Sequence, residues 1–392
     1  VFLGLSKGNV YAEVAAPHAI LMEVSTGTVL MEKAADEKVH PASVTKIMTM
    51  LLIMEALEQG KIALNDTVTV SEYAASMGGS QVYLEPYETQ TVETLLKCVA
   101  VASANDAAVA LAEHISGSVD AFVELMNQKA ASLGCTNTHF TNPNGLPDEN
   151  HYTTAHDMAL IAQAAYNNAT FRKVCQTTTY CIGTTNKCGE KRWLSNHHKM
   201  LPDRDYTYEG CTGGKTGFTQ AALNTLVTYA ERNGRRLVCV SLRTNGRQIY
   251  TDTASLLDYG FNNFQNYSIF NRKTWADAKM LYPSLYFGQP ETVANLRPTC
   301  TVTLPVGMGQ LCIANAFEEV IQIKFPSFHR MVRHIYDTYG YPLSKLITNP
   351  LRADVVYIIM KPLEWIFLLF LYLVDVRPEQ RIRNQYVLQF KR

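Results

Sequence analysis

Residues 41–46 read PASVTK and lead directly into the apolar run IMTMLLIMEAL at residues 47–57. The run has almost no polar face, so we expect a helix that is buried on all sides. Residues three apart on a helix share one face, which brings Lys46 within reach of the Ser43 hydroxyl. Burial lowers the pKa of a lysine, so Lys46 can act as the base that a serine nucleophile requires. The stretch therefore predicts a nucleophile and its base at the mouth of a buried helix.

A lysine in a dry site needs hydrogen-bond partners, so other polar side chains must converge on Lys46. Two later stretches offer them: Ser-Ala-Asn at residues 103–105, within VASANDAAVALAEH, and Lys-Thr-Gly at residues 215–217, within GGKTGFT. Each tripeptide alone is most often a helix N-cap or a turn. The ordered combination of all three is far rarer, and it predicts a single polar site.

Strand-like runs lie at both ends of the first 260 residues. Residues 19–24 and 28–32 are separated by Ser-Thr-Gly, and residues 226–230 and 237–242 flank a strong Asn-Gly turn signal. Between these hairpins the apolar spacing is helical, at residues 51–57, 109–115, 122–126 and 158–161. Because tight turns join antiparallel strands, we predict an α+β catalytic domain over residues 13–262, with helices packed on an antiparallel sheet and a helical insertion.

The character of the chain changes after this domain. Residues 262–273, NNFQNYSIFNRK, are polar and indicate a loop, whereas period-two alternation appears at residues 299–304 and 320–325. We therefore predict a small β-rich domain at residues 271–325, followed by a connector at residues 326–352.

The two ends predict where the protein is found. Residues 1–12, VFLGLSKGNVYA, resemble the remnant of a secretory signal peptide. Near the other end, an apolar stretch predicts a membrane-anchoring helix at residues 353–376, followed by a basic tail at 377–392. Lys361, Pro362 and Glu364 interrupt the stretch, so the alternatives are a helix that lies in the membrane interface and, after it, a soluble core helix. We thus expect an exported, extracytoplasmic protein that is anchored to the cell membrane.

Composition excludes several function classes. The chain has 35 Lys and Arg against 35 Asp and Glu, which leaves no basic excess for nucleic-acid binding. None of the nine cysteines forms Cys-x-x-Cys, and the pairs His151/His156 and His197/His198 lack the spacing of a helical zinc motif. We therefore expect neither a metal nor a cofactor. Cys181 and Cys188 flank a turn and are either a disulfide pair or free thiols.

The three motifs in this order resemble those of the serine penicillin-interacting enzymes, which include DD-peptidases and class A β-lactamases. The chain is most similar to the D-alanyl-D-alanine carboxypeptidases, the low-molecular-mass penicillin-binding proteins. The resemblance covers about residues 19–261 and extends to TNPNGLPDENHYTTAHDMA at residues 141–159 and DTASLLDYGF at residues 252–261. It implies a DD-peptidase/β-lactamase-like fold and peptidoglycan stem peptides ending in D-Ala-D-Ala as substrate, with β-lactam antibiotics as inhibitors.

The resemblance also implies roles for individual residues. Ser43 would attack the carbonyl between two D-alanines to form an acyl-enzyme, with Lys46 as its base. Ser103 would relay a proton to the leaving amine. Asn105 would hold Lys46 or the peptide amide.

Four further roles fall on the Lys-Thr-Gly strand. Lys215 and Thr216 would bind the terminal carboxylate of the substrate. Gly217 would leave room for substrate along the strand edge, and the backbone N–H groups of Ser43 and Phe218 would form the oxyanion hole.

The chain departs from the family pattern at two positions. Leu223 follows Ala222 where many members have glycine, and Ile249 occupies a position that is often arginine, with Arg247 two residues earlier. Two alternative functions remain at this point. A class A-like β-lactamase is disfavoured because no Glu-x-x-Leu-Asn run lies between the second and third motifs. An inactive peptidoglycan-binding scaffold is the other.

Overall fold

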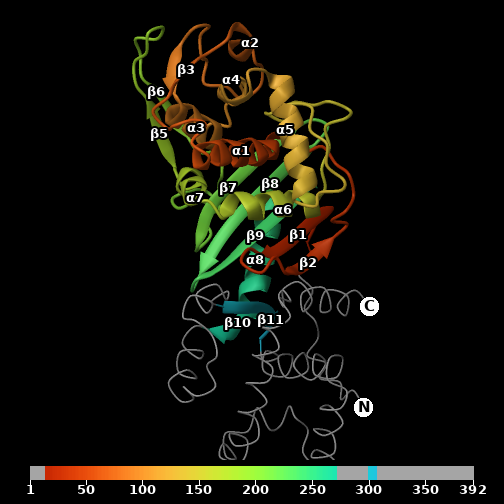
Figure 1. Cartoon of the computed structure of the whole chain (residues 1–392). Coiled ribbons are helices and arrows are strands. Elements are labelled where there is room, and N and C mark those ends of the chain that lie inside the picture. Colours follow the sequence, from red (N-terminus) through yellow and green to blue (C-terminus); the bar gives the residue numbers. More distant parts are fainter. Residues whose placement is uncertain (1–13, 272–298, 307–392) are drawn as a thin grey trace, which may run out of the picture. The chain divides into compact units, whose positions relative to one another are not determined.

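The computed structural model describes residues 14–271 and 299–306, and the chain divides into two units at residues 261/262. The first unit is built on a five-stranded antiparallel sheet with the order β2-β1-β9-β8-β7 (Figure 1). These strands are β1 (His18–Glu23), β2 (Val29–Lys33), β7 (Cys211–Thr219), β8 (Leu223–Arg232) and β9 (Arg235–Thr244). Strand β7 lies at one edge of the sheet, with β8 as its strand neighbour.

Both predicted hairpins are confirmed. β1 pairs with β2, and β8 pairs with β9 across Asn233 and Gly234, whose φ angles of 52° and 74° are those of a tight hairpin turn. The predicted α+β class with an antiparallel sheet is therefore correct.

A helical segment lies between β2 and β7 in the chain. After the 3₁₀ turn η1 (Ala42–Thr45) come α1 (Lys46–Glu58), α2 (Glu72–Ala75), α3 (Val92–Val101), α4 (Asn105–Ser116), α5 (Val119–Ser132), α6 (Ala155–Tyr166) and α7 (Ala169–Cys175). Two small ladders accompany them, β3 (Thr67–Thr69) with β4 (Thr89–Thr91), and β5 (Thr179–Ile182) with β6 (Arg192–Ser195). Helix α8 (Gln248–Asn263) follows the sheet.

Helices cover both faces of the sheet, and the side chains of each strand point alternately toward one face and the other. Ile20 of β1 and Val240 of β9 belong to the main core, on the side where α6 contacts both strands. Leu21 and Leu237 point the other way, where Gly260 of α8 lies so close that an added Cβ would be 2.7–2.8 Å from their methyl groups. Period-two alternation thus sorts the strand residues between two helical layers (Figure 1).

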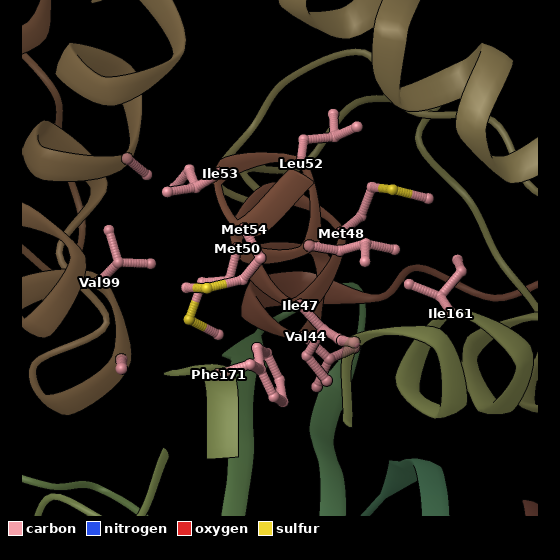
Figure 2. Packing of buried hydrophobic residues seen from close by; sticks show 14 of the residues in the cluster. Val44, Ile47, Met48, Met50, Leu52, Ile53, Met54, Val99, Ile161 and Phe171 are labelled. Carbon is pink, nitrogen blue, oxygen red and sulfur yellow. The ribbon is translucent and has the colours of Figure 1, made fainter. Parts of the chain in front are cut away.

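Helix α1 is surrounded by other elements, as its sequence predicted. Ten of its 13 residues are buried. Figure 2 shows its methionine, leucine and isoleucine side chains pointing in several directions, with Val99 of α3 on one side and Ile161 of α6 on the other. Lys46, the first residue of this helix, is therefore buried in the protein interior.

In the second unit, the described residues 262–271 and 299–306 contain one antiparallel pair, β10 (Phe264–Asn271) with β11 (Thr299–Pro305). The reading of residues 262–273 as a loop was therefore wrong, since β-structure begins at Phe264. Polar residues such as Asn266, which accepts a hydrogen bond from Thr303 Oγ1 (2.9 Å), concealed this strand.

Several predicted segments lie outside the described residues. They are the signal remnant at residues 1–12, most of the β-rich domain at 271–325, the connector at 326–352, the membrane helix at 353–376 and the tail at 377–392. Within the described ranges, the length and hydropathy of the helices are insufficient for a membrane span.

Candidate active site

The nucleophile candidate lies in a turn that two glycines approach closely. Ser43 belongs to η1, and the preceding Ala42 has a left-handed φ of 51°. A Cβ added to Gly217 would lie 2.7 Å from the Ser43 nitrogen, and one added to Gly145 would lie 1.9 Å from the Ala42 oxygen. Only glycine allows β7 and the loop around Gly145 to contact the backbone beside Ser43 this closely.

Lys46 is the centre of the polar network. Its Nζ donates to Ser43 Oγ (3.0 Å), to Asn105 Oδ1 (2.7 Å) and to the Asn144 carbonyl (2.6 Å), and the side chain is fully buried. The predicted meeting of Ser43, Lys46 and Asn105 is thus present. One oxygen comes from η1, which we call the nucleophile turn after the role predicted for Ser43, one from α4 and one from the loop before α6.

Burial is the main reason why the pKa of Lys46 falls well below its usual value near 10.5. The positive charge of Lys215 lowers this pKa further, and the negative charge of Asp106 raises it. The net shift is downward and favours the neutral amine, which is the form that can accept a proton.

The Ser-Ala-Asn motif forms the turn into α4. Asn105 Nδ2 donates to the Gly78 carbonyl (2.7 Å), which turns its Oδ1 toward Lys46. Ser103 has a left-handed φ of 59° and is 3% exposed, and its Oγ has no hydrogen-bond partner within the described structure. A buried hydroxyl without a partner is costly, so this atom is available to a bound ligand.

Lys215 is the second buried lysine. It lies on edge strand β7, is 2% exposed and donates to the Thr216 carbonyl (2.8 Å). Burial lowers its pKa to about 7. Thr216 follows on the same strand, and Phe218 is 63% exposed.

Gly217 also allows a close contact within the protein, in addition to the space for substrate that the sequence predicts. Besides approaching Ser43, an added Cβ would lie 2.5 Å from Thr225 Oγ1, whose hydroxyl donates to the Pro41 carbonyl (2.9 Å). The missing side chain therefore allows the sheet to contact the nucleophile turn, whatever space it also leaves for a ligand.

Two features of the site were missed at the sequence level. The Asn144 carbonyl accepts from Lys46, and the same loop is tied to α1 because Thr49 Oγ1 donates to the Pro143 carbonyl (2.5 Å). His151 Nε2 also lies 2.8 Å from Thr45 Oγ1 in the nucleophile turn. The stretch at residues 141–159 was recognised as family-like, but its side chains gave no signal for a role that a backbone oxygen performs.

The histidines considered for zinc have other contacts. The Thr141 N–H donates to His151 Nδ1 (3.0 Å), and His198 Nε2 lies 3.0 Å from Thr228 Oγ1. Burial lowers the pKa of both rings to about 4. No group of three or more potential metal ligands occurs in the described ranges. Cys181 and Cys188 are free thiols.

Both departures from the family pattern have structural counterparts. Leu223 has a left-handed φ of 54°, a conformation that glycine adopts without strain. Ile249 is 2% exposed within α8, so its side chain is part of the protein interior. Arg247 lies just before this helix, and its charge lowers the pKa of Asp205 after the larger effect of Lys199.

Comparison with known proteins agrees with this geometry. The family model described as D-alanyl-D-alanine carboxypeptidase matches residues 6–246, and one described as the DUF6688 C-terminal domain matches residues 287–387. DacF, a D-alanyl-D-alanine carboxypeptidase of Bacillus subtilis, is 43% identical over 66% of this chain and 65% of its own length. DacA of Haemophilus influenzae is 32% identical over 74% of this chain and 75% of its own. The chain thus spans just under two thirds of DacF.

Solved structures show the same fold. The carboxypeptidase DacD from Francisella tularensis superposes with a TM-score of 0.63 at 29% identity, covering 75% of this chain and 82% of that chain. Penicillin binding protein 5 from Haemophilus influenzae gives 0.62 at 30% identity, covering 75% and 84%. With more than half of its length matched by the family model, the chain belongs to the D-alanyl-D-alanine carboxypeptidase family, a family of peptidases.

Proposed function

We propose that this chain is an active serine D-Ala-D-Ala carboxypeptidase that removes the terminal D-alanine from peptidoglycan stem peptides through an acyl-enzyme on Ser43. The hydrogen bonds of Lys46 carry the proposal. Two of its partners, Asn105 Oδ1 and the Asn144 carbonyl, are oxygens that only accept, whereas the Ser43 hydroxyl can also donate. The ammonium form of Lys46 donates to all three oxygens, whereas the neutral amine has two N–H groups for the two acceptors and one lone pair, which remains for the Ser43 proton.

The acylation step follows from this arrangement. Lys46 takes the proton of Ser43 as Oγ bonds to the substrate carbonyl carbon, and the resulting oxyanion is held by the N–H groups of Ser43 and Phe218. The C–N bond to the terminal D-alanine then breaks. The leaving amine receives the proton from Lys46 through the Ser103 hydroxyl, whose buried Oγ is otherwise without a partner in the described structure.

Deacylation reverses the roles. Water attacks the ester carbon while Lys46 accepts its proton, the bond to Ser43 Oγ breaks, and Ser43 regains a proton from Lys46. Before and during acylation, Lys215 and Thr216 bind the carboxylate of the terminal D-alanine, which departs with that leaving group. The edge position of β7 supports this assignment, since a peptide can pair with a strand edge.

The experiment that tests the proposal follows the full chain by intact mass after addition of benzylpenicillin, with Ser43→Ala as control, and measures D-alanine released from a peptide ending in D-Ala-D-Ala. We expect a persistent adduct of one antibiotic mass on Ser43 and release of D-alanine. Rapid destruction of penicillin would instead indicate a β-lactamase. Intact penicillin and intact peptide would overturn the proposal and favour a scaffold.

The place of action is a second part of the proposal. The apolar stretch at residues 353–376 and the basic tail support an exported enzyme that is anchored to the cell membrane and faces the peptidoglycan. Fractionation of cells that express the full chain should place it with the membrane, and replacement of Phe367 and Phe370 by lysine should release it. Recovery of the unaltered chain in the soluble fraction would contradict the anchor.

A further inference from the structure

Asp106, which directly follows Asn105, is a buried carboxylate with no role in the chemistry described above. It lies in the first turn of α4 and is fully buried. Its oxygens accept from the backbone N–H groups of Val82 (3.1 Å), Leu84 (3.1 Å) and Ala107 (2.9 Å). It forms no ion pair with any described residue. Burying a carboxylate whose partners are N–H groups alone has a large free-energy cost of desolvation. We therefore expect such a group to have a structural or functional role.

The N–H groups of Val82 and Leu84 belong to residues 78–84, which we call the wall segment. The same segment is also held by Arg192, whose Nη1 donates to the carbonyls of Val82 (3.1 Å) and Tyr83 (3.0 Å). Arg192 is itself paired with the buried Glu88. A carboxylate and a guanidinium therefore hold the wall segment together, an arrangement we call the clamp.

The beginning of the wall segment orients Asn105. The Asn105 side chain donates to the Gly78 carbonyl and its backbone N–H donates to the Ser80 carbonyl, both at 2.7 Å. Gly79 lies between them, and a Cβ there would be 2.8 Å from Asn105 Nδ2. Any shift of the wall segment would thus move the amide whose oxygen holds Lys46.

Charge gives Asp106 a second connection to the base. Besides burial, the positive charge of Lys215 from β7 lowers the pKa of Lys46, and the negative charge of Asp106 from α4 raises it. Burial lowers the pKa of His197, and the charges of Lys215 and Lys46 lower it further. Arg192 forms an ion pair with Glu88. Among the described carboxylates, Asp106 is the one whose charge acts on Lys46.

We propose that Asp106 is a positioning residue of this site: its carboxylate fixes the wall segment that orients Asn105, and its negative charge offsets part of the positive charge at Lys46. The inference deepens the proposed acyl-enzyme mechanism and rests on it. Asp106 touches neither Ser43 nor the substrate in this scheme and acts through its two neighbours, Asn105 and Lys46.

The test is Asp106→Asn in the full chain, an isosteric change that removes the charge. The rate of Ser43 acylation by benzylpenicillin is measured against pH. This rate should rise as Lys46 loses its proton, and we call that part of the pH–rate profile the rising limb. Without the carboxylate, protonated Lys46 is less stabilised, so the rising limb should move to lower pH by on the order of one unit. The plateau rate should fall roughly tenfold, because the base is weaker and Asn105 is less fixed.

A matched control separates this effect from a loss of stability. Asp157 is also a buried first-turn aspartate, and it accepts from Asn137 N and Thr138 Oγ1, both at 2.8 Å, but it does not influence Lys46. Asp157→Asn should lower the melting temperature and leave the limb in place. An unmoved limb in Asp106→Asn, or an equal shift in both variants, would overturn the inference.

A second variant, Asp106→Glu, keeps the inference testable if Asp106→Asn does not fold. It keeps the charge and disturbs the clamp, so the plateau rate of acylation should fall while the rising limb stays at the original pH. A limb displaced to lower pH with the charge retained would contradict the inference. Failure of the unaltered chain to form any Ser43 adduct would instead count against the proposed function.

Discussion

Lys46 and Lys215, two buried lysines of the described structure, have very different hydrogen bonds. Lys46, at the start of α1, donates to three oxygens from three segments of the chain. Lys215, on edge strand β7, has one hydrogen bond among the described residues, to the carbonyl of its own neighbour Thr216. Burial lowers the pKa of both.

The difference indicates a division of labour. An amine whose N–H groups are already occupied is fixed in position and suits proton transfer over one short distance. An amine with unused N–H groups still lacks the partner that a buried cation needs, and a substrate carboxylate would supply it. Lys46 therefore has its hydrogen-bond partners before substrate binds, whereas Lys215 still has unused N–H groups.

The largest effect should come from Lys46→Met, which removes the base and keeps the length of the side chain. We expect acylation of Ser43 by benzylpenicillin to slow by roughly 10³-fold, within the usual range for general-base catalysis. Intact-mass kinetics would measure it. Lys97→Met, which removes a lysine paired with Glu93 on α3, serves as control. A loss of less than tenfold would show that another group takes the proton.

Lys215→Met should instead weaken recognition of the substrate's terminal carboxylate. We compare kcat/KM for a peptide ending in D-Ala-D-Ala with that for the same peptide carrying a terminal amide. The unaltered chain should prefer the carboxylate, and the variant should lose about 2 kcal/mol of this preference, roughly 30-fold. If the variant slows both peptides equally, Lys215 does not recognise the carboxylate.

Gly217→Ala probes the contact between the two lysine-bearing regions. The new Cβ would meet the Ser43 nitrogen and Thr225 Oγ1, so the sheet and the nucleophile turn must move apart. We expect destabilisation of about 1–3 kcal/mol, typical of overpacking, together with slower acylation. Gly183→Ala is the control, because a Cβ there would meet nothing within 4 Å. Equal urea midpoints for the two variants would refute the close contact.

The free energy of unfolding should change gradually with pH. Folding lowers the pKa of Lys215 from its usual value near 10.5 to about 7, so between these values the unfolded chain binds more protons. Stability therefore rises with pH above 7, by up to about 1.4 kcal/mol per pH unit for one group. Lys215→Met should be more stable than the unaltered chain at pH 6, and urea unfolding should show this advantage shrinking by pH 9. A constant difference would contradict the burial of a titrating lysine.

The sequence by itself determined the parts that depend on side-chain type and regular spacing. The lack of a polar face predicted that α1 is buried, the Asn-Gly turn placed the β8–β9 hairpin, and the i, i+3 rule brought Ser43 and Lys46 together. The ordered motifs also identified Asn105 and Lys215 as polar groups of the same site. Each of these signals lies within a short stretch of sequence, so a single sequence is enough to detect it.

Only the tertiary structure decided the contacts that depend on backbone position. The Asn144 carbonyl has no sequence signature, because every residue carries such an oxygen, and its role follows from where the loop before α6 lies. The close approach at Gly217 and the clamp by Asp106 join segments far apart in the chain. Strand β10 was concealed for a related reason, since its polar residues find partners only once β11 lies beside it. Such pairings between distant segments arise when the chain folds, and no local pattern records them.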